Sequence, residues 1–300
     1  MNFYDGGVGT DNKLYALSIN VNYNGVVYNK KVFKDAGITA TPKTEEELLA
    51  DCALIKAKGV VAVASNFKDG WPLGYFDDGT MQADLSAVPN YKNTLVKNDK
   101  YYNDDKGGAL YGLNLLRNLS SKGYLEKDLM STNWDGSKKD IATGKVAMMF
   151  LPSWFPSQAI GAGMNVDEVG MFPVPGAKAL VFSPDTFYAV TKNSKFPELS
   201  KEFFKYMWKD GLMPLKVGNI PPNKDVKLDS AFVKELLSSK LPLIQGDVDS
   251  ADYQALVNKA QIDPGAIAQE YVSAKSDKDA QAVTDKYNKK WSEAKKALGK

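Results

Sequence analysis

The sequence predicts an α/β fold that is large enough for two domains. The chain has 300 residues, of which 44% are hydrophobic, and a chain of this length normally divides its core between two domains. Residues 14–19 and 25–28 are short apolar runs typical of strands. A helical pattern over residues 44–59 and an apolar run over 60–63 follow, so strand, helix and strand alternate as in βαβ proteins.

The first predicted helix has clear signals at both ends. Thr44 with Glu47 three residues later forms a capping box, and Gly59 stands where a terminating glycine is expected. Apolar residues at helical spacing predict further helices over 110–119, 199–207 and 280–298. Apolar runs predict strands over 146–150 and 187–190. Because no repeat or low-complexity linker interrupts these elements, we expect ordered chain to cross any domain boundary.

The charge composition argues against a nucleic-acid partner. There are 38 basic and 36 acidic residues, and no stretch collects lysines without acidic neighbours. Arg117 is the single arginine, so the side chain best suited to grip carboxylate or phosphate is almost absent. This scarcity favours a neutral ligand, but a codon preference for lysine explains it equally well.

The absence of histidine excludes several kinds of chemistry. Without histidine the chain has no Ser-His-Asp triad and no histidine-zinc site. Cys52 is the only cysteine, so the chain forms no internal disulfide, and its helical position indicates a packing role. The glycine patterns fit neither the three-glycine dinucleotide-binding spacing nor the P-loop. We expect no cofactor and no metal site. No leader or apolar run of membrane-spanning length is expected.

Several motifs occur in the order found in one known family. The matching stretches are Asn12-Lys13-Leu14-Tyr15-Ala16-Leu17, Tyr28-Asn29-Lys30 with Phe33 and Ala36-Gly37, Pro42-Lys43-Thr44 through Leu48, Gly144-Lys145-Val146-Ala147-Met148-Met149, Ser153-Trp154, 190–207, and Gly218-Asn219-Ile220-Pro221. Pro152 stands where the family usually has glycine. In these segments the chain resembles the bacterial extracellular solute-binding proteins of sugar ABC transporters, which include maltose-binding protein and Gram-positive oligosaccharide receptors.

The resemblance implies a periplasmic-binding-protein-like fold of two α/β lobes, joined by a hinge that the chain crosses several times. It implies that residues 1–22 and 183–237 form a remnant of lobe one, and that residues 23–182 and 238–300 form lobe two. The first lobe is then incomplete in this chain, by on the order of 100 residues from typical lobe sizes.

The resemblance also implies a function. Such a receptor captures a sugar or oligosaccharide in the cleft between the lobes and delivers it to the membrane permease subunits of an ABC importer. It is extracellular, either lipid-anchored at the cell surface or periplasmic, and we expect the lipid anchor to be absent from this chain. The alternatives are a glycoside hydrolase and a cell-surface carbohydrate-binding module. A hydrolase needs two opposed carboxylates about 5 to 10 Å apart, and no such pair stands out, so we do not expect an enzyme.

Aromatic and polar residues at the mapped edges of the cleft are the candidate ligand contacts. Sugars present apolar C–H faces and a rim of hydroxyls, which suit flat rings beside carboxylates and amides. Trp154 follows a strand and corresponds to a stacking tryptophan of the family, although it could instead cap the core. Trp71 follows a polar loop, where cleft lining and core packing are equally compatible. Trp134, Trp208 and Trp291 are expected to be packing residues.

The remaining candidates lie where the chain crosses between lobes. Asn22 and Asn24 sit at the first crossover, where they offer either ligand contacts or simple turn chemistry. Asp185, with Phe187 close by, lies at the next crossover and can accept hydrogen bonds from paired hydroxyls, or remain an exposed loop acid. Tyr253 is the candidate at the last crossover.

Overall fold

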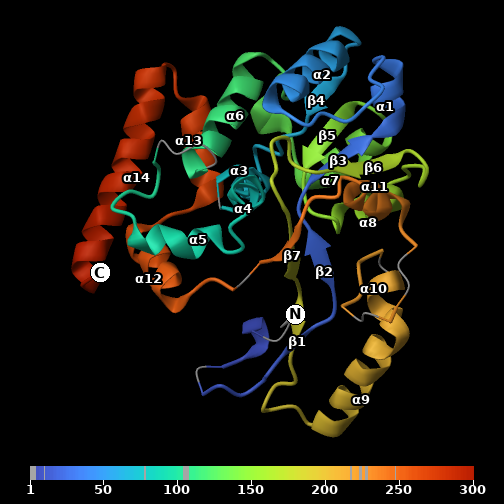
Figure 1. The fold of residues 1–300 in the computed structure, drawn as a ribbon, viewed down its shortest axis with the longest axis vertical. Coiled ribbons are helices and arrows are strands. Elements are labelled where there is room, and N and C mark those ends of the chain that lie inside the picture. Colours follow the sequence, from blue (N-terminus) through green and yellow to red (C-terminus); the bar gives the residue numbers. More distant parts are fainter. Residues whose placement is uncertain are drawn as a thin grey trace.

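The structure of the chain is a computed structural model, which describes residues 5–9, 11–77, 79–103, 108–216, 218–222, 225–226, 229–246 and 248–300. Two bodies of unequal size are joined by strands that run between them (Figure 1). The larger body combines a helix-covered sheet with a neighbouring group of helices, and the smaller body holds a short strand pair and two helices. The predicted α/β class is confirmed.

A four-stranded sheet forms the centre of the larger body. Its strand order is β4 (Val61–Val63), β5 (Val146–Phe150), β3 (Val26–Asn29) and β6 (Val169–Phe172). β4 runs parallel to β5, whereas β3 is antiparallel to both β5 and β6. Every residue of β3, β5 and β6 is buried, so both faces of this sheet need a cover of helices.

Helices cover both faces because alternate side chains of the strands point in opposite directions. Val26 and Tyr28 of β3 belong to one apolar cluster, and Val27 between them belongs to the other. On the first face lie α1 (Lys30–Asp35) and α2 (Glu45–Ala57), and the Thr44 side chain caps α2 as predicted. On the second face lie α7 (Trp134–Ala142), α8 (Phe155–Gly161) and α11 (Ala231–Leu237).

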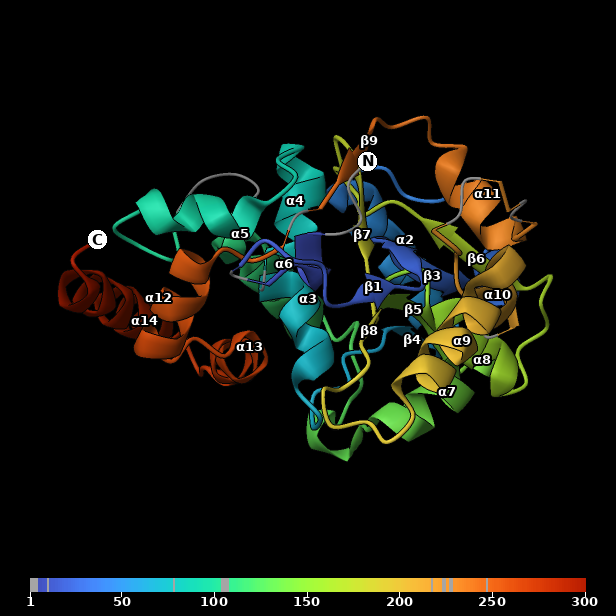
Figure 2. The same cartoon turned by 90° about the horizontal axis from the view of Figure 1, so that it is seen from below.

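A group of helices extends the larger body to one side, as Figure 2 shows for α12, α13 and α14. Its centre includes Trp291, whose side chain is fully buried and donates from Nε1 to the Asn98 carbonyl oxygen at 3.0 Å. The packing role predicted for Trp291 is therefore confirmed. The elements of this group are η2 (Trp71–Leu73), α3 (Gly74–Asp77), α4 (Thr80–Ser86), α5 (Tyr91–Thr94), η3 (Leu95–Lys97), α6 (Ala109–Ser121), η4 (Leu129–Ser131), α12 (Ala251–Ala260), α13 (Pro264–Ser273) and α14 (Asp277–Leu298).

The two bodies are joined by a three-stranded sheet in the order β2 (Val21–Tyr23), β7 (Leu180–Pro184) and β9 (Leu243–Gln245). β2 and β7 are antiparallel, and both continue into the smaller body, whereas β9 is parallel to β7. The chain returns to the larger body near Ile220, which forms a bridge with Val21. Described chain thus crosses between the bodies three times, in agreement with the predicted multiple crossing.

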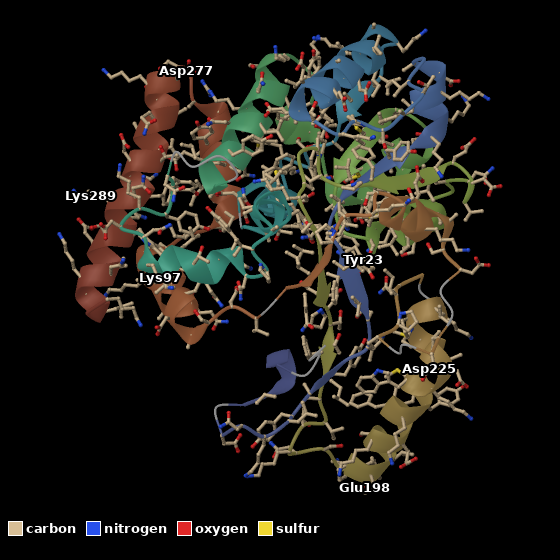
Figure 3. The ribbon with its side chains drawn as sticks, viewed as in Figure 1. Tyr23, Lys97, Glu198, Asp225, Asp277 and Lys289 are labelled. Atoms are coloured by element: carbon tan, nitrogen blue, oxygen red, sulfur yellow. The ribbon has the colours of Figure 1, made fainter. Side chains whose placement is uncertain are left out.

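The smaller body contains η1 (Asp5–Gly7), the antiparallel pair β1 (Leu17–Ser18) and β8 (Phe187–Tyr188), and three helical segments. Those segments are α9 (Pro197–Trp208), η5 (Lys209–Gly211) and α10 (Leu212–Lys216). In Figure 3, Glu198 on α9 marks the far end of this body, and Tyr23 marks the junction with the larger one.

Helix α9 has a large exposed apolar face. Leu199 is 69% exposed and Phe203 is 56% exposed, and no described residue of α9 is buried. The predicted helix is present, but it lacks the cover that its apolar spacing implies.

Three sequence predictions need correction. The strands expected over 14–19 and 187–190 are limited to β1 and β8, which pair with each other over two residues each. The predicted remnant of lobe one over 183–237 is wrong for α11, since Phe232, Val233 and Leu236 are buried against the second face of the large sheet. Among the described helices, none combines the length and apolar character needed to cross a bilayer.

Candidate functional site

Two adjoining hollows lie where the bodies meet, and they share Trp154 and Asp185. The more open hollow has a volume of about 530 Å³, and its walls include Trp71, Trp134 and Asn219. The second hollow has a volume of about 240 Å³ and reaches Asn22, Asn24 and Lys92. Asp185 and Asn219 come from the crossing segments, and the tryptophans come from the larger body.

Three tryptophans form an aromatic wall in the open hollow. The ring centroid of Trp71 lies 4.8 Å from that of Trp134 and 6.2 Å from that of Trp154, and the Trp134 and Trp154 centroids are 5.8 Å apart. These separations lie within the range of favourable aromatic pairs. Trp71 is nevertheless 45% exposed, so the wall presents ring surface to the hollow. Such surface can stack against the apolar face of a ring-shaped ligand.

The loop before Trp71 also fixes Trp134. The Asp69 carboxylate accepts a 2.5 Å hydrogen bond from the Trp134 backbone N–H at the start of α7. Gly70, between Asp69 and Trp71, has φ of 73°, a backbone conformation that favours glycine. One acidic side chain and one glycine turn therefore hold two of the three tryptophans next to each other.

Trp154 is held against the first crossing strand. The Ser153 backbone N–H donates to the Tyr23 carbonyl oxygen at 2.9 Å, and the Tyr23 N–H donates to Ser153 Oγ at 3.0 Å. This reciprocal pair joins the end of β5 to the end of β2. Trp154 therefore lies at the hinge itself, where a ligand can contact it together with residues of the crossing segments.

Asp185 is oriented by two buried amides. Its Oδ2 accepts from Asn22 Nδ2 at 2.7 Å and from Asn20 Nδ2 at 3.2 Å. Its backbone N–H donates to the Asn20 carbonyl oxygen, and Ser18 Oγ donates to the Asp185 carbonyl oxygen. Both amides use the same carboxylate oxygen, which leaves Oδ1 without a hydrogen bond to the described residues. Oδ1 can accept hydrogen bonds from a ligand.

Among the described residues that line the second hollow, the one cation is already paired. Lys92 Nζ lies 3.0 Å from Asp249 Oδ1, and both side chains are about 30% exposed or less. Asn24 at the edge of the same hollow donates from Nδ2 to the Thr80 carbonyl oxygen at 3.4 Å. The described polar groups here thus include amides, a paired lysine and the Asp185 carboxylate, which suit the hydroxyls of a neutral ligand better than an anion.

Five predicted site residues come together at these hollows: Asn22, Asn24, Trp71, Trp154 and Asp185. The structure does not bring the other two predicted residues to them.

Phe187 lies in β8, where its ring packs over Gly6 of the smaller body. Tyr253 is only 5% exposed, and its hydroxyl lies 3.3 Å from that of Tyr101. Ser250 caps α12 and thereby turns Tyr253 inward, toward Trp291. Neither Phe187 nor Tyr253 therefore lines the two hollows.

Trp134 was expected to be a packing residue, but it lines the open hollow. The sequence signal that could have identified Trp134 was its position at the first turn of α7. It directly follows Asn133, whose side chain caps the helix. Helix starts of this kind often border loops that carry function. No group of three metal-ligating side chains gathers among the described residues.

Comparison with protein families gives a match over most of the chain. The model of the bacterial extracellular solute-binding proteins matches residues 2–211. The chain is 31% identical over 229 residues to the diacetylchitobiose binding protein DasA of Streptomyces coelicolor, covering 72% of this chain and 50% of that protein. It is 27% identical over 221 residues to the multiple sugar-binding protein of Streptococcus mutans, covering 69% of this chain and 50% of that protein. The chain spans about half the length of these relatives.

Solved structures of similar fold come from Bifidobacterium animalis subsp. lactis. The ABC-transporter binding protein BlMnBP1, in complex with mannobiose, superposes with a TM-score of 0.82 at 26% identity, covering 95% of this chain and 71% of that one. The manno-oligosaccharide specific protein BlMnBP2, in complex with mannotriose, gives a TM-score of 0.83 at 25% identity, covering 96% and 72% of the two chains.

Proposed function

The chain belongs to the bacterial extracellular solute-binding proteins, and we propose that it captures a neutral sugar or short oligosaccharide in the two hollows at the hinge. The observation that carries this proposal is a hollow lined by three tryptophans together with the Asp185 carboxylate. Flat rings stack on the C–H face of a pyranose, while the carboxylate and the nearby amides accept and donate hydrogen bonds to its hydroxyls. Relatives of similar sequence or fold carry names of sugar receptors.

A neutral ligand fits the charges around the hollows. Arg117, the single arginine, donates to the Tyr271 and Ala274 carbonyl oxygens and pairs with Asp277. It is therefore occupied among helices of the larger body and lines neither hollow. Lys92, the cation that reaches the second hollow, is paired with Asp249. No unpaired cation among the described lining residues is available to an anionic ligand.

The arrangement gives little support to a glycoside hydrolase. Asp185 is the only carboxylate among the described residues that line the two hollows. Hydrolysis of a glycosidic bond normally needs a second carboxyl group on the opposite side of the bond. We propose that the chain binds its sugar without cleaving it.

The two-body arrangement supports a role in delivery to an importer. A ligand that contacts Trp154 on one side and Asp185 on the other favours the geometry in which the bodies are close together. We propose that membrane permease subunits of an ABC importer recognise this form. The protein would act outside the cytoplasmic membrane, in the periplasm or on a lipid anchor.

A ligand screen tests this proposal. Mannobiose, mannotriose, diacetylchitobiose and raffinose are titrated into the protein, and binding is followed by calorimetry and by the melting temperature. We expect at least one neutral oligosaccharide to raise the melting temperature and to be recovered uncleaved. A rise caused only by anionic or metal ligands, or the appearance of shorter sugars, would contradict the proposal.

A further inference from the structure

Asp84 is a buried acid directly beneath the second hollow. It lies on α4, is 1% exposed, and shares a small cavity with Asn24, Tyr75 and Pro152. None of the sugar-contacting roles proposed above involves this residue. A buried carboxyl group normally requires hydrogen-bonding partners, and those of Asp84 come from the hinge.

Asp84 binds the strand that crosses between the bodies. Its Oδ1 accepts a 2.7 Å hydrogen bond from the Val181 backbone N–H in β7. Its carbonyl oxygen accepts from the N–H groups of Lys178 and Ala179, at 2.9 and 3.2 Å, where the chain enters that strand. Asp84 thus accepts three hydrogen bonds, which fasten the beginning of β7 to α4.

Asp84 also lies beside the other crossing segment. The Asn24 N–H donates to the Val181 carbonyl oxygen at 3.1 Å, next to the N–H that Asp84 binds. The Asn24 amide favours the charged form of the carboxyl group, although its direct hydrogen bond goes to Thr80. The second carboxylate oxygen, Oδ2, has no direct hydrogen-bond partner among the described residues.

The protonation of Asp84 is set by burial and by these contacts. Burial raises its pKa to about 7, while the hydrogen bond from Val181 and the nearby Asn24 amide oppose the rise. Several titratable or charged groups lie on α3, α5 and α6 and just before β7, which all pack around α4. None of them contributes to this pKa shift: Tyr75, Asp77, Tyr91, Lys92, Tyr111, Arg117 and Lys178. Burial, opposed by the contacts with the hinge, therefore decides the protonation of Asp84.

We propose that Asp84 is a positioning residue that fastens β7 and the ligand-facing Asn24 to α4, and that its ionisation makes sugar binding depend on pH. The predicted effect on sugar binding rests on the proposed function, whereas the predicted titration at the hinge does not. A carboxylate accepts stronger hydrogen bonds than a neutral carboxyl group does. The charged form therefore holds Val181 and Asn24 in the observed arrangement, and protonation loosens both.

The first arm of the test needs no sugar. The Val181 amide proton and the Asn24 side-chain amide signals are followed by NMR between pH 5.5 and 8.5. We expect the Val181 signal to titrate with a midpoint near 7 in the native chain and to stay fixed in Asp84→Asn. Asp51→Asn is the matched control, because burial and Glu47 raise the pKa of Asp51 to about 6 on α2, away from the hinge. A Val181 titration that survives in Asp84→Asn would overturn the inference.

The second arm measures the dissociation constant for mannotriose across the same range by calorimetry. We expect binding about fivefold tighter at pH 8 than at pH 6, a typical coupling between two sites. In Asp84→Asn the affinity stays near the native value at pH 6 throughout, while Asp51→Asn keeps the native profile. The same profile in Asp84→Asn and the native chain would contradict the coupling. Absence of mannotriose binding at every pH would count against the proposed function for that sugar, and the first arm would still decide whether Asp84 senses pH at the hinge.

Discussion

Replacing Trp154 by alanine removes the one aromatic ring that both hollows share among the described residues. The ring lies 6.2 Å from Trp71 and 5.8 Å from Trp134, so its loss opens the aromatic wall without deleting it. Burial of a large apolar ring against a ligand contributes about 1 to 3 kcal/mol. We therefore expect sugar affinity to fall by about 5- to 150-fold.

Calorimetry with the tightest sugar of the screen measures this loss, and the melting temperature reports any effect on the fold. Because Trp154 is half-buried and the Ser153 hydrogen bonds to Tyr23 remain, we expect a stability loss of about 1 to 2 kcal/mol, as for a typical single substitution. Trp208→Ala is the matched control, since Trp208 is a half-buried tryptophan on α9 that lines neither hollow. Unchanged affinity in Trp154→Ala, or an equal loss in Trp208→Ala, would refute the stacking role.

Three further substitutions have distinct expected outcomes. Asp185→Ala should weaken sugar binding at least tenfold, by about 1.4 kcal/mol or more, and should lower the melting temperature because the buried Asn22 amide loses its acceptor; calorimetry and thermal unfolding measure the two effects. Leu199→Lys combined with Phe203→Lys should change stability by less than about 0.5 kcal/mol per site, since both side chains are exposed, and a large loss in urea unfolding would show that the α9 face is covered. The Asp84→Asn variant should become more stable relative to the native chain as pH rises. Burial raises the pKa of the Asp84 carboxyl group in the folded chain to about 7, so the native chain loses stability as pH rises through 7. Denaturation at pH 5.5 and 8.5 measures the difference.

Local signals in the sequence predicted much of the larger body correctly. Thr44 accepts the hydrogen bond from the Glu47 N–H that a capping box requires, and α2 begins at the next residue. The predicted strand over 146–150 is β5, and the C-terminal apolar stripe is the buried side of α14, with Trp291 at its centre. Such elements depend on contacts close in sequence or on a strong periodic pattern, so the sequence alone determines them.

The errors arose where distant segments decide the outcome. Nothing within residues 231–237 indicates which body they join, because the surface that α11 covers, including the edge strand β6, lies far away in the sequence. Phe187 and Tyr253 were chosen for their place near crossovers, but pairing with β1 and capping by Ser250 direct them elsewhere. Trp134 was missed because its link to Trp71 passes through Asp69, a residue 65 positions away in the sequence.

The resemblance to a known family supplied what local patterns could not. It placed Asn22, Asn24, Trp71, Trp154 and Asp185 near one cleft, and all five line the two hollows. Residues 22 and 185 are far apart in sequence, yet they share a 2.7 Å hydrogen bond. The contribution of each residue to ligand affinity remains a prediction for the experiments above.

The most direct measurement of the central claim is a titration of the tryptophan indole N–H signals by NMR. The chain has five tryptophans, of which Trp71, Trp134 and Trp154 line the open hollow, Trp208 lies on α9, and Trp291 is buried among helices. Addition of a bound oligosaccharide should shift the three signals of the hollow together, with one saturation curve, and should leave those of Trp208 and Trp291 in place. A saturable shift confined to Trp208 or Trp291, or binding that moves none of the three, would show that the sugar site lies elsewhere and would contradict the account.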